Sequence, residues 1–152
     1  MKKNLFYYLF AVICSVTLFA SCSDDDENTG LVIDQVVGTF TGNLEVLNQT
    51  IPNTSISVTK VDANTVKVEL KDFTFANMPI GDISADCKAT LDKDGDDFEL
   101  NGTTTLTVVA LGNIELPIVI TGEVDAKELD IDINITNVPM LNALKVEFEG
   151  TK

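Results

Sequence analysis

The densest group of side chains that could bind a ligand is an acidic turn. Asp92, Asp94, Asp96 and Asp97 surround Gly95. Ca²⁺-binding loops gather their oxygen ligands from carboxylates at alternate positions around a glycine. A complete helix-loop-helix site also needs an acidic residue at the twelfth loop position and flanking helices, whereas a strand pattern follows this turn directly. Two interpretations stay open: a weak Ca²⁺ site formed by Asp92, Asp94 and Asp96, or an acidic hairpin turn without metal.

Catalytic residue sets are not evident elsewhere in the sequence. The chain has no histidine, which removes the commonest general base and metal ligand. It also contains no Gly-x-Ser-x-Gly motif, no phosphate-binding glycine loop and no cysteine pair at metal-ligand spacing. Acidic residues are plentiful, but the strand pattern places them on solvent-facing positions and in turns. We therefore expect no enzymatic activity and no cofactor.

Four large apolar side chains could instead hold a small apolar ligand: Phe40, Phe73, Phe75 and Met78. If the strands around them close into a barrel, these side chains could line its mouth. The alternative is that they are ordinary core residues, because a small barrel rich in Ile, Val and Leu can be filled by its own side chains.

The elements that position these residues are short strands. From residue 36 to the C-terminus, apolar and polar residues alternate in short segments separated by turn signals, and no window shows a helical period. About eight strands joined by short turns indicate an all-β antiparallel meander. We expect an up-and-down barrel, because closure removes the two exposed sheet edges. A two-sheet β-sandwich is the alternative.

Two irregularities and one cysteine are predicted within these strands. Gly42 inside the first strand indicates a bend or a close backbone approach. The change of parity between Leu70 and Phe73 indicates a β-bulge near Asp72. Cys87 falls on the apolar side of its strand, so we expect a buried, unreactive thiol.

The first 21 residues have the layout of a secretory signal. Lys2 and Lys3 are followed by a segment, residues 5–20, that is apolar except for Ser15 and Thr17. The segment is too short to span a bilayer comfortably, which takes about 20 residues. We therefore divide the chain into a signal peptide (1–21), a tether (22–35) and one β domain (36–152).

The end of the signal, Leu18-Phe19-Ala20-Ser21-Cys22, resembles a bacterial lipobox. The resemblance implies that Cys22 receives a diacylglycerol, that the chain is cut before it and that the new amino terminus is acylated, which anchors the protein in a membrane. The run Ser23 to Glu27 resembles the acidic export signal of surface-displayed lipoproteins; a solvated linker is the alternative. The implied location is the outer membrane, exposed at the cell surface or else facing the periplasm.

The charge of the chain excludes one class of partner. The sequence has 24 acidic and 10 basic residues, and loss of Lys2 and Lys3 with the signal changes the net charge from −14 to −16. Nucleic acids need cationic partners, so we expect no nucleic-acid binding. Acidic residues near lipid head groups are repelled by anionic lipid, so the acidic run is not a membrane-binding patch.

Within the β domain, residues 38–44, 70–75 and 78–83 resemble the calycin-like β-barrel lipoproteins of gut bacteria. The resemblance implies an eight-stranded, lipocalin-like barrel and carries over no catalytic or binding residues. The tryptophan typical of true lipocalins is absent, so their ligand chemistry does not carry over. Two functions remain: capture of a small apolar ligand inside the barrel, or a surface interaction made by a filled barrel. An internal void of at least about 300 Å³ would favour the first.

Overall fold

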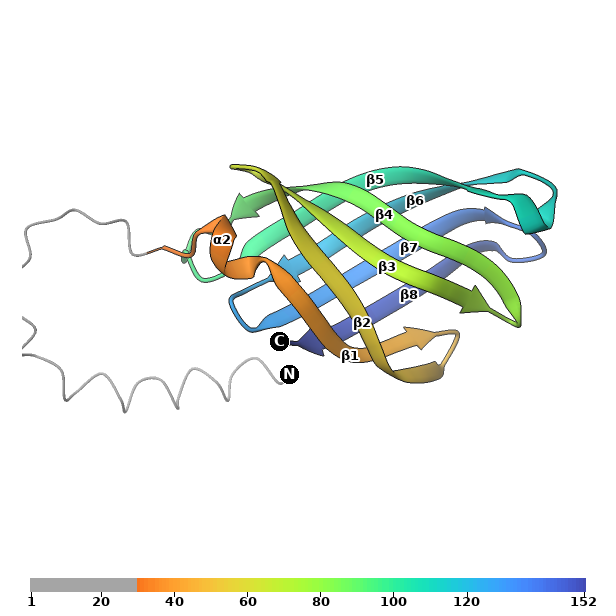
Figure 1. Cartoon of the computed structure of the whole chain (residues 1–152), viewed down its shortest axis with the longest axis horizontal. Helices are drawn as coiled ribbons and strands as arrows, with labels where there is room; N and C mark the ends of the chain where they lie inside the picture. The colour runs from red at the N-terminus through yellow and green to blue at the C-terminus, as the bar shows by residue number, and fades with distance from the viewer. Residues whose placement is uncertain (1–29) are drawn as a thin grey trace, which may run out of the picture.

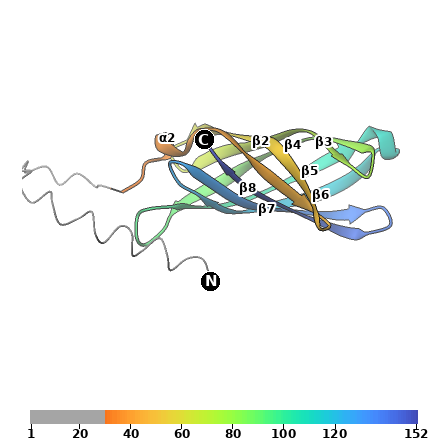
Figure 2. The same cartoon turned by 90° about the horizontal axis from the view of Figure 1, so that it is seen from below.

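The computed structural model describes residues 30–152, and these form a closed antiparallel barrel (Figures 1 and 2). Each strand pairs with the next along the chain, and β1 pairs with β8 to close the ring. The strands are β1 (Gly38–Val46), β2 (Gln49–Asp62), β3 (Thr65–Phe75), β4 (Met78–Leu91), β5 (Phe98–Val108), β6 (Ile114–Val124), β7 (Glu128–Val138) and β8 (Asn142–Thr151). The predicted eight-stranded meander barrel is confirmed, and the β-sandwich alternative is wrong.

Apolar side chains fill the inside of the barrel and polar side chains cover its outside. On β7, for example, Leu129, Ile131 and Ile133 are buried, whereas Asp130 lies on the opposite side of the strand. Every buried residue of the core is hydrophobic, and none of the described residues is a buried polar or charged one. Residues 30–152 thus contain a closed barrel with its own hydrophobic core, and we expect this segment to fold by itself.

The barrel closes where two glycines face each other. Gly42 on β1 pairs with Gly150 on β8, and the β1–β2 register shifts between Gly42 and Leu44. A Cβ atom on Gly42 would lie 1.9 Å from the carbonyl oxygen of Glu149, so the two backbones approach too closely for a side chain. The predicted bend at Gly42 is confirmed.

The predicted bulge near Asp72 is also present. The β3–β4 register shifts between Leu70 and Phe73, and Asp72 adopts a left-handed conformation with a φ of 53°. The backbone N–H of Asp72 donates to the carboxylate of Asp82 at 2.8 Å, which satisfies the donor that the bulge removes from the ladder. The shift turns Phe73 back towards the core, where it is buried.

The last residues of the predicted tether pack against the barrel. Residues 33–36 form a short helix, α2 (Ile33–Val36), and both Ile33 and Val36 are buried against the core. A four-residue helix is too short to show a helical period, so the sequence pattern did not reveal it. No helix within residues 30–152 is long and apolar enough to cross a membrane. Cys22, the signal and the tether up to residue 29 lie outside the described residues.

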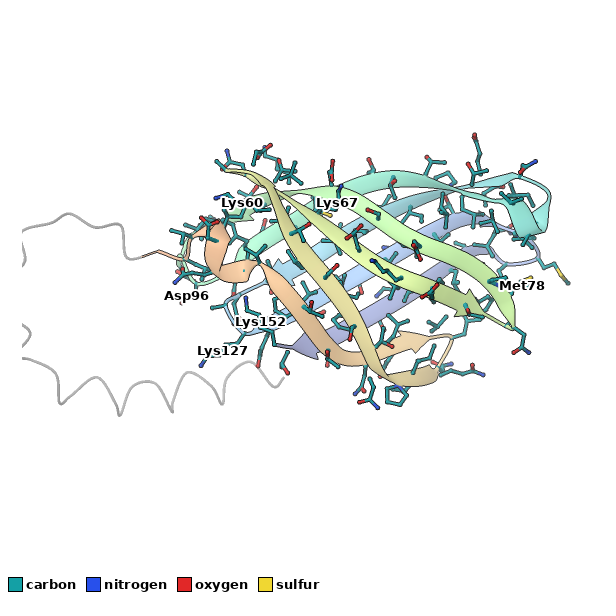
Figure 3. The ribbon with its side chains drawn as sticks, in the orientation of Figure 1. Lys60, Lys67, Met78, Asp96, Lys127 and Lys152 are labelled. Atoms are coloured by element: carbon teal, nitrogen blue, oxygen red, sulfur yellow. The ribbon has the colours of Figure 1, made fainter. Side chains whose placement is uncertain are left out.

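The barrel has two different ends, because alternate turns of a meander lie on the same side. We call the end that carries α2 and the β2–β3, β4–β5 and β6–β7 turns the proximal end. The distal end carries the β1–β2, β3–β4 and β7–β8 turns and the 3₁₀ helix η1 (Val109–Leu111) between β5 and β6. Figure 3 shows Asp96 and Lys127 at the proximal end and Met78 at the distal end.

Candidate functional site

The acidic turn joins β4 to β5 at the proximal end and is held by its own backbone. The N–H of Asp92 donates to the carbonyl of Asp97 at 2.8 Å, and the N–H of Gly95 donates to the carbonyl of Asp92 at 3.0 Å. The Asp92 carboxylate accepts the N–H of Lys93 at 2.6 Å. Within residues 30–152 no three acidic or cysteine side chains come together as a group that could hold a metal ion. The geometry thus fits a hairpin turn, and Ca²⁺ binding by Asp92, Asp94 and Asp96 stays a prediction.

Repulsion acts on one carboxyl of this turn. Burial raises the pKa of Asp97, and the charges of Asp125 and Glu123 on the neighbouring strand connection raise it further. The ionised form of Asp97 is therefore disfavoured in the folded protein. Burial and the neighbouring carboxylates thus make ionised Asp97 electrostatically unfavourable in this turn.

The turn has a structural partner that the sequence did not indicate. The carbonyl oxygen of Gly95 accepts the N–H of Leu31 at 3.0 Å, which fastens the chain entering the barrel. Lys60 on β2 pairs with Asp34 of α2 at 2.8 Å. These contacts hold α2 against the proximal end.

Lys152 covers the proximal end of the barrel and lies above the ring of Phe40. Its Nζ donates to the carbonyls of Gln35 and Val37 at 2.6 and 2.8 Å, and it lies 5.2 Å from the centroid of the Phe40 ring. Phe40 is fully buried. It is therefore a core residue beneath the α2 connection, and a role for Phe40 in lining a ligand site stays a prediction. No sequence signal could have linked residues so far apart in the chain.

The other three predicted ligand-lining residues lie together on the β3–β4 hairpin at the distal end. Phe73 is buried, whereas Phe75 and its cross-strand partner Met78 are half-buried. Phe75 packs against the core together with Leu106, Leu111 and Ile114. The structure thus groups Phe73, Phe75 and Met78 and separates Phe40 from them.

Cys87 is buried, as predicted. Burial, with a smaller contribution from the charge of Asp86, raises the pKa of its thiol to about 11. A Cβ atom on Gly102, the cross-strand partner of Cys87, would lie 2.5 Å from its Sγ. The thiol is therefore packed tightly and protonated at neutral pH, which makes it a poor nucleophile.

Four clefts formed by residues 30–152 lie on the outer surface of the barrel. One, of about 580 Å³, crosses β4 to β7, and the other three measure about 530, 350 and 240 Å³. The walls of the 580 Å³ cleft are mainly outward-facing polar side chains, among them Lys88, Glu99, Asn101, Thr121 and Glu123. Such walls suit polar or charged groups and not an apolar ligand.

Acidic side chains face each other across the strands of this outer surface. Glu45, Glu147 and Asp132 are paired in one row across β1, β8 and β7. A second row pairs the residues Glu149, Asp130, Glu123 and Glu99 across β8, β7, β6 and β5. Lys145 forms ion pairs with Asp132 and Glu147, and its hydrogen bonds to these two carboxylates raise its pKa. Like charges placed directly opposite destabilise a sheet, and together they make this face strongly electronegative.

Comparison with known proteins gives a fold and a family. No curated protein matches the chain. A crystal structure of a "putative outer membrane protein" from Bacteroides fragilis is similar in fold, with a TM-score of 0.58 and 24% sequence identity. The similarity covers 78% of this chain and 52% of that chain, so this protein matches about half the length of the solved structure. Residues 36–151 match the calycin-like beta-barrel domain, and the protein therefore belongs to the calycin-like β-barrel family.

Proposed function

We propose that this protein is a lipid-anchored protein of the cell envelope that acts through the outer surface of a filled barrel and binds no ligand inside it. The observation that carries the proposal is the occupied interior. Phe40 and Phe148, the largest fully buried side chains, are completely inaccessible, and they lie in one continuous apolar core. Clefts of about 580 and 530 Å³ lie on the outside of the barrel, and most of the residues that line them are polar. The available binding surface is therefore the exterior.

Anchoring through Cys22 is supported by the sequence before the barrel and by the character of the barrel wall. The lipobox-like residues 18–22 precede the domain, and the fold neighbour carries an outer-membrane name. The outward-facing side chains of strands such as β7 and β8 include many charged residues. A barrel that itself crosses a membrane presents an apolar band to lipid. The charged outer wall that residues 30–152 form lacks such a band, and a lipid anchor on Cys22, with acyl chains such as palmitate, would attach the protein to the membrane instead.

Capture of a small apolar ligand is the competing function. The half-buried side chains Phe75, Leu106 and Leu111 are the residues that such a ligand would have to displace. Because they already pack against the core, entry of a ligand would first cost their contacts. The geometry therefore supports an exterior function better.

Native mass spectrometry of the protein purified from its own cells tests the interior. We expect the mass of the lipidated chain alone. A co-purifying small apolar molecule that is lost in unfolded samples would overturn the filled-barrel proposal.

Two cysteine variants test the anchor. Cys22→Ser should abolish incorporation of labelled palmitate and release the protein from the membrane fraction, whereas Cys87→Ala, the matched control, should leave both unchanged. A Cys22→Ser protein that remained in the membrane fraction would overturn the anchor. Protease added to intact cells then distinguishes the two locations, because only a surface-exposed domain is degraded.

A further inference from the structure

The turns at the distal end of the barrel carry no charged side chain, and the charged residues next to them in sequence, such as Glu45, Glu115 and Lys145, lie on the strands. The segments that form its four tips and the adjoining strand ends, residues 46–59, 73–81, 104–114 and 133–144, contain no Asp, Glu, Lys or Arg. Each proximal turn, by contrast, carries at least one acid: Asp62, Asp92 to Asp97, and Asp125. In a chain with a net charge of −14, this separation of charge along the barrel axis marks the distal end as a distinct surface.

Apolar side chains protrude from the same tips. Met140 is 103% exposed, Val109 75% and Leu47 54%. We call the following set the apolar crown; every tip contributes at least one member, and all are exposed except the half-buried Met78: Leu47, Ile51, Met78, Val109, Met140 and Leu141. These side chains leave apolar surface in water at the end of the barrel where the core comes closest to solvent.

The backbone at these tips is strained by the apolar residues it carries. Leu47, Ala76 and Met140 have positive φ values of 47°, 49° and 71°. Left-handed backbone at a tight turn favours Gly, Asn or Asp, and it costs other residues about 1 kcal/mol. Since Leu47 and Met140 are exposed, this cost is not offset by core packing. Contact with an external surface would offset it.

The arrangement and charge of the apolar crown indicate which external surface it contacts. Its exposed apolar side chains stand on four separate tips and do not form the continuous apolar patch that the centre of a protein interface presents. Two copies of this strongly negative chain would repel each other. A fluid bilayer, however, can fill the spaces between protruding side chains, and it admits uncharged tips without the cost of burying a charge. We propose that the apolar crown inserts into the interface of an uncharged, zwitterionic phospholipid bilayer.

Asparagines at the tips suit the same environment. Asn48, Asn77 and Asn142 also have positive φ values and lie next to or near the apolar tip residues. Their amide groups are neutral and can hydrogen-bond at the level of the lipid head groups while the neighbouring apolar side chains enter the acyl region.

The bilayer contact does not depend on the proposed lipidation of Cys22, because every residue of the apolar crown lies within residues 30–152.

Tryptophan placed at either end tests the contact. Because the chain contains no tryptophan, Met140→Trp and Val61→Trp in residues 30–152 each introduce a single emitter. Val61 is 49% exposed near the proximal end of β2 and provides the matched control. With phosphatidylcholine vesicles we expect a blue shift, and quenching by acyl-brominated lipid, for Met140→Trp alone. No response at Met140, or an equal response at Val61, would overturn the proposal.

A charge placed on the crown tests its contribution to binding. Met140→Asp should reduce vesicle co-sedimentation at least tenfold, whereas Val61→Asp should leave it unchanged. Met140 is fully exposed with a positive φ, which Asp adopts more readily, so the fold should be retained and circular dichroism will verify it.

Lipid composition provides a second test of the occupant. Replacing half of the phosphatidylcholine with phosphatidylglycerol should weaken binding, because the protein is strongly negative. Unchanged binding of Met140→Asp, stronger binding to anionic vesicles, or self-association through the crown in place of vesicle binding would each overturn the proposal. The protein used here lacks Cys22, so these failures leave the anchor proposal standing.

Discussion

Replacing Phe40 by Ala measures directly whether the barrel interior is filled. The Phe40 ring is fully buried on β1, next to Ile56 on β2, and Lys152 covers it from the proximal end. Removing a phenyl ring from a packed core costs about 3–5 kcal/mol of unfolding free energy, because transfer and cavity contributions add. If the ring instead lined an open pocket, most of it would already be solvated and the loss would be small.

Urea unfolding of residues 30–152, followed by far-UV circular dichroism, is the suitable assay. The sequence has no tryptophan, and its two tyrosines, Tyr7 and Tyr8, precede this segment, so intrinsic fluorescence is weak. With an m value of about 1.5 kcal/mol/M, the midpoint should fall by about 2–3 M.

Two variants separate packing from the other contacts of Phe40. Phe75→Ala, at a half-buried position on the distal hairpin, should cost about 1–2 kcal/mol. Lys152→Met, which removes the cation above the ring and two hydrogen bonds, should cost about 1 kcal/mol. A loss of less than about 1 kcal/mol of unfolding free energy for Phe40→Ala would refute the filled interior and favour capture of a ligand inside the barrel.

Three further outcomes follow from the packing and electrostatics of β4, β5 and their turn. Gly102→Ala should cost about 1–3 kcal/mol in the same unfolding assay, since its Cβ would lie 2.5 Å from the Cys87 Sγ and 2.8 Å from the Asp86 carbonyl oxygen; an unchanged midpoint would contradict this close approach. The Cys87 thiol, with its pKa raised to about 11, should react with a thiol reagent at pH 7 only as fast as the barrel opens, so labelling as fast as in urea would contradict its burial. Burial raises the pKa of Asp97, so ionisation of this carboxyl destabilises the fold as the pH rises through the folded pKa. Asp97→Asn should therefore stabilise the protein at pH 7 by up to about 0.5 kcal/mol. This gain should disappear below the unfolded pKa of about 3.9, and a gain that persisted there would contradict the raised pKa of Asp97 as its cause.

Features of this fold that depend on residues close together in the sequence were predictable from it. The alternation of apolar and polar residues predicts the strands and their inward faces, and the parity change before Phe73 predicts the bulge at Asp72. Gly42 predicts the close approach that the structure places opposite Gly150. Each signal is contained within a few residues, which is why a single sequence reveals it.

Features that depend on the stagger between strands were not predictable. The sequence predicts that Phe40 and Phe73 face inward, and both do. It does not predict their depth along the barrel axis, because depth depends on the register shifts at Gly42 and Asp72 acting together. The contact between Lys152 and the carbonyls of Gln35 and Val37 joins residues more than a hundred positions apart, and no local pattern encodes it.

The two ends of the barrel differ because the turns of a meander lie alternately at one end and at the other. Successive turns alternate between the ends, so residues 46–54 and 135–144 meet at one end although they are distant in sequence. The turns that carry acids, such as Asp92 to Asp97, are the ones beside α2, where one hydrogen bond from Leu31 and the Lys60–Asp34 ion pair hold the entering chain. The uncharged turns are those farthest from it. The interior is occupied by apolar side chains, so binding has to use the outer surface. That surface offers two chemically distinct features: the contrast between the acidic and the uncharged end, and the acidic rows on the strands between them.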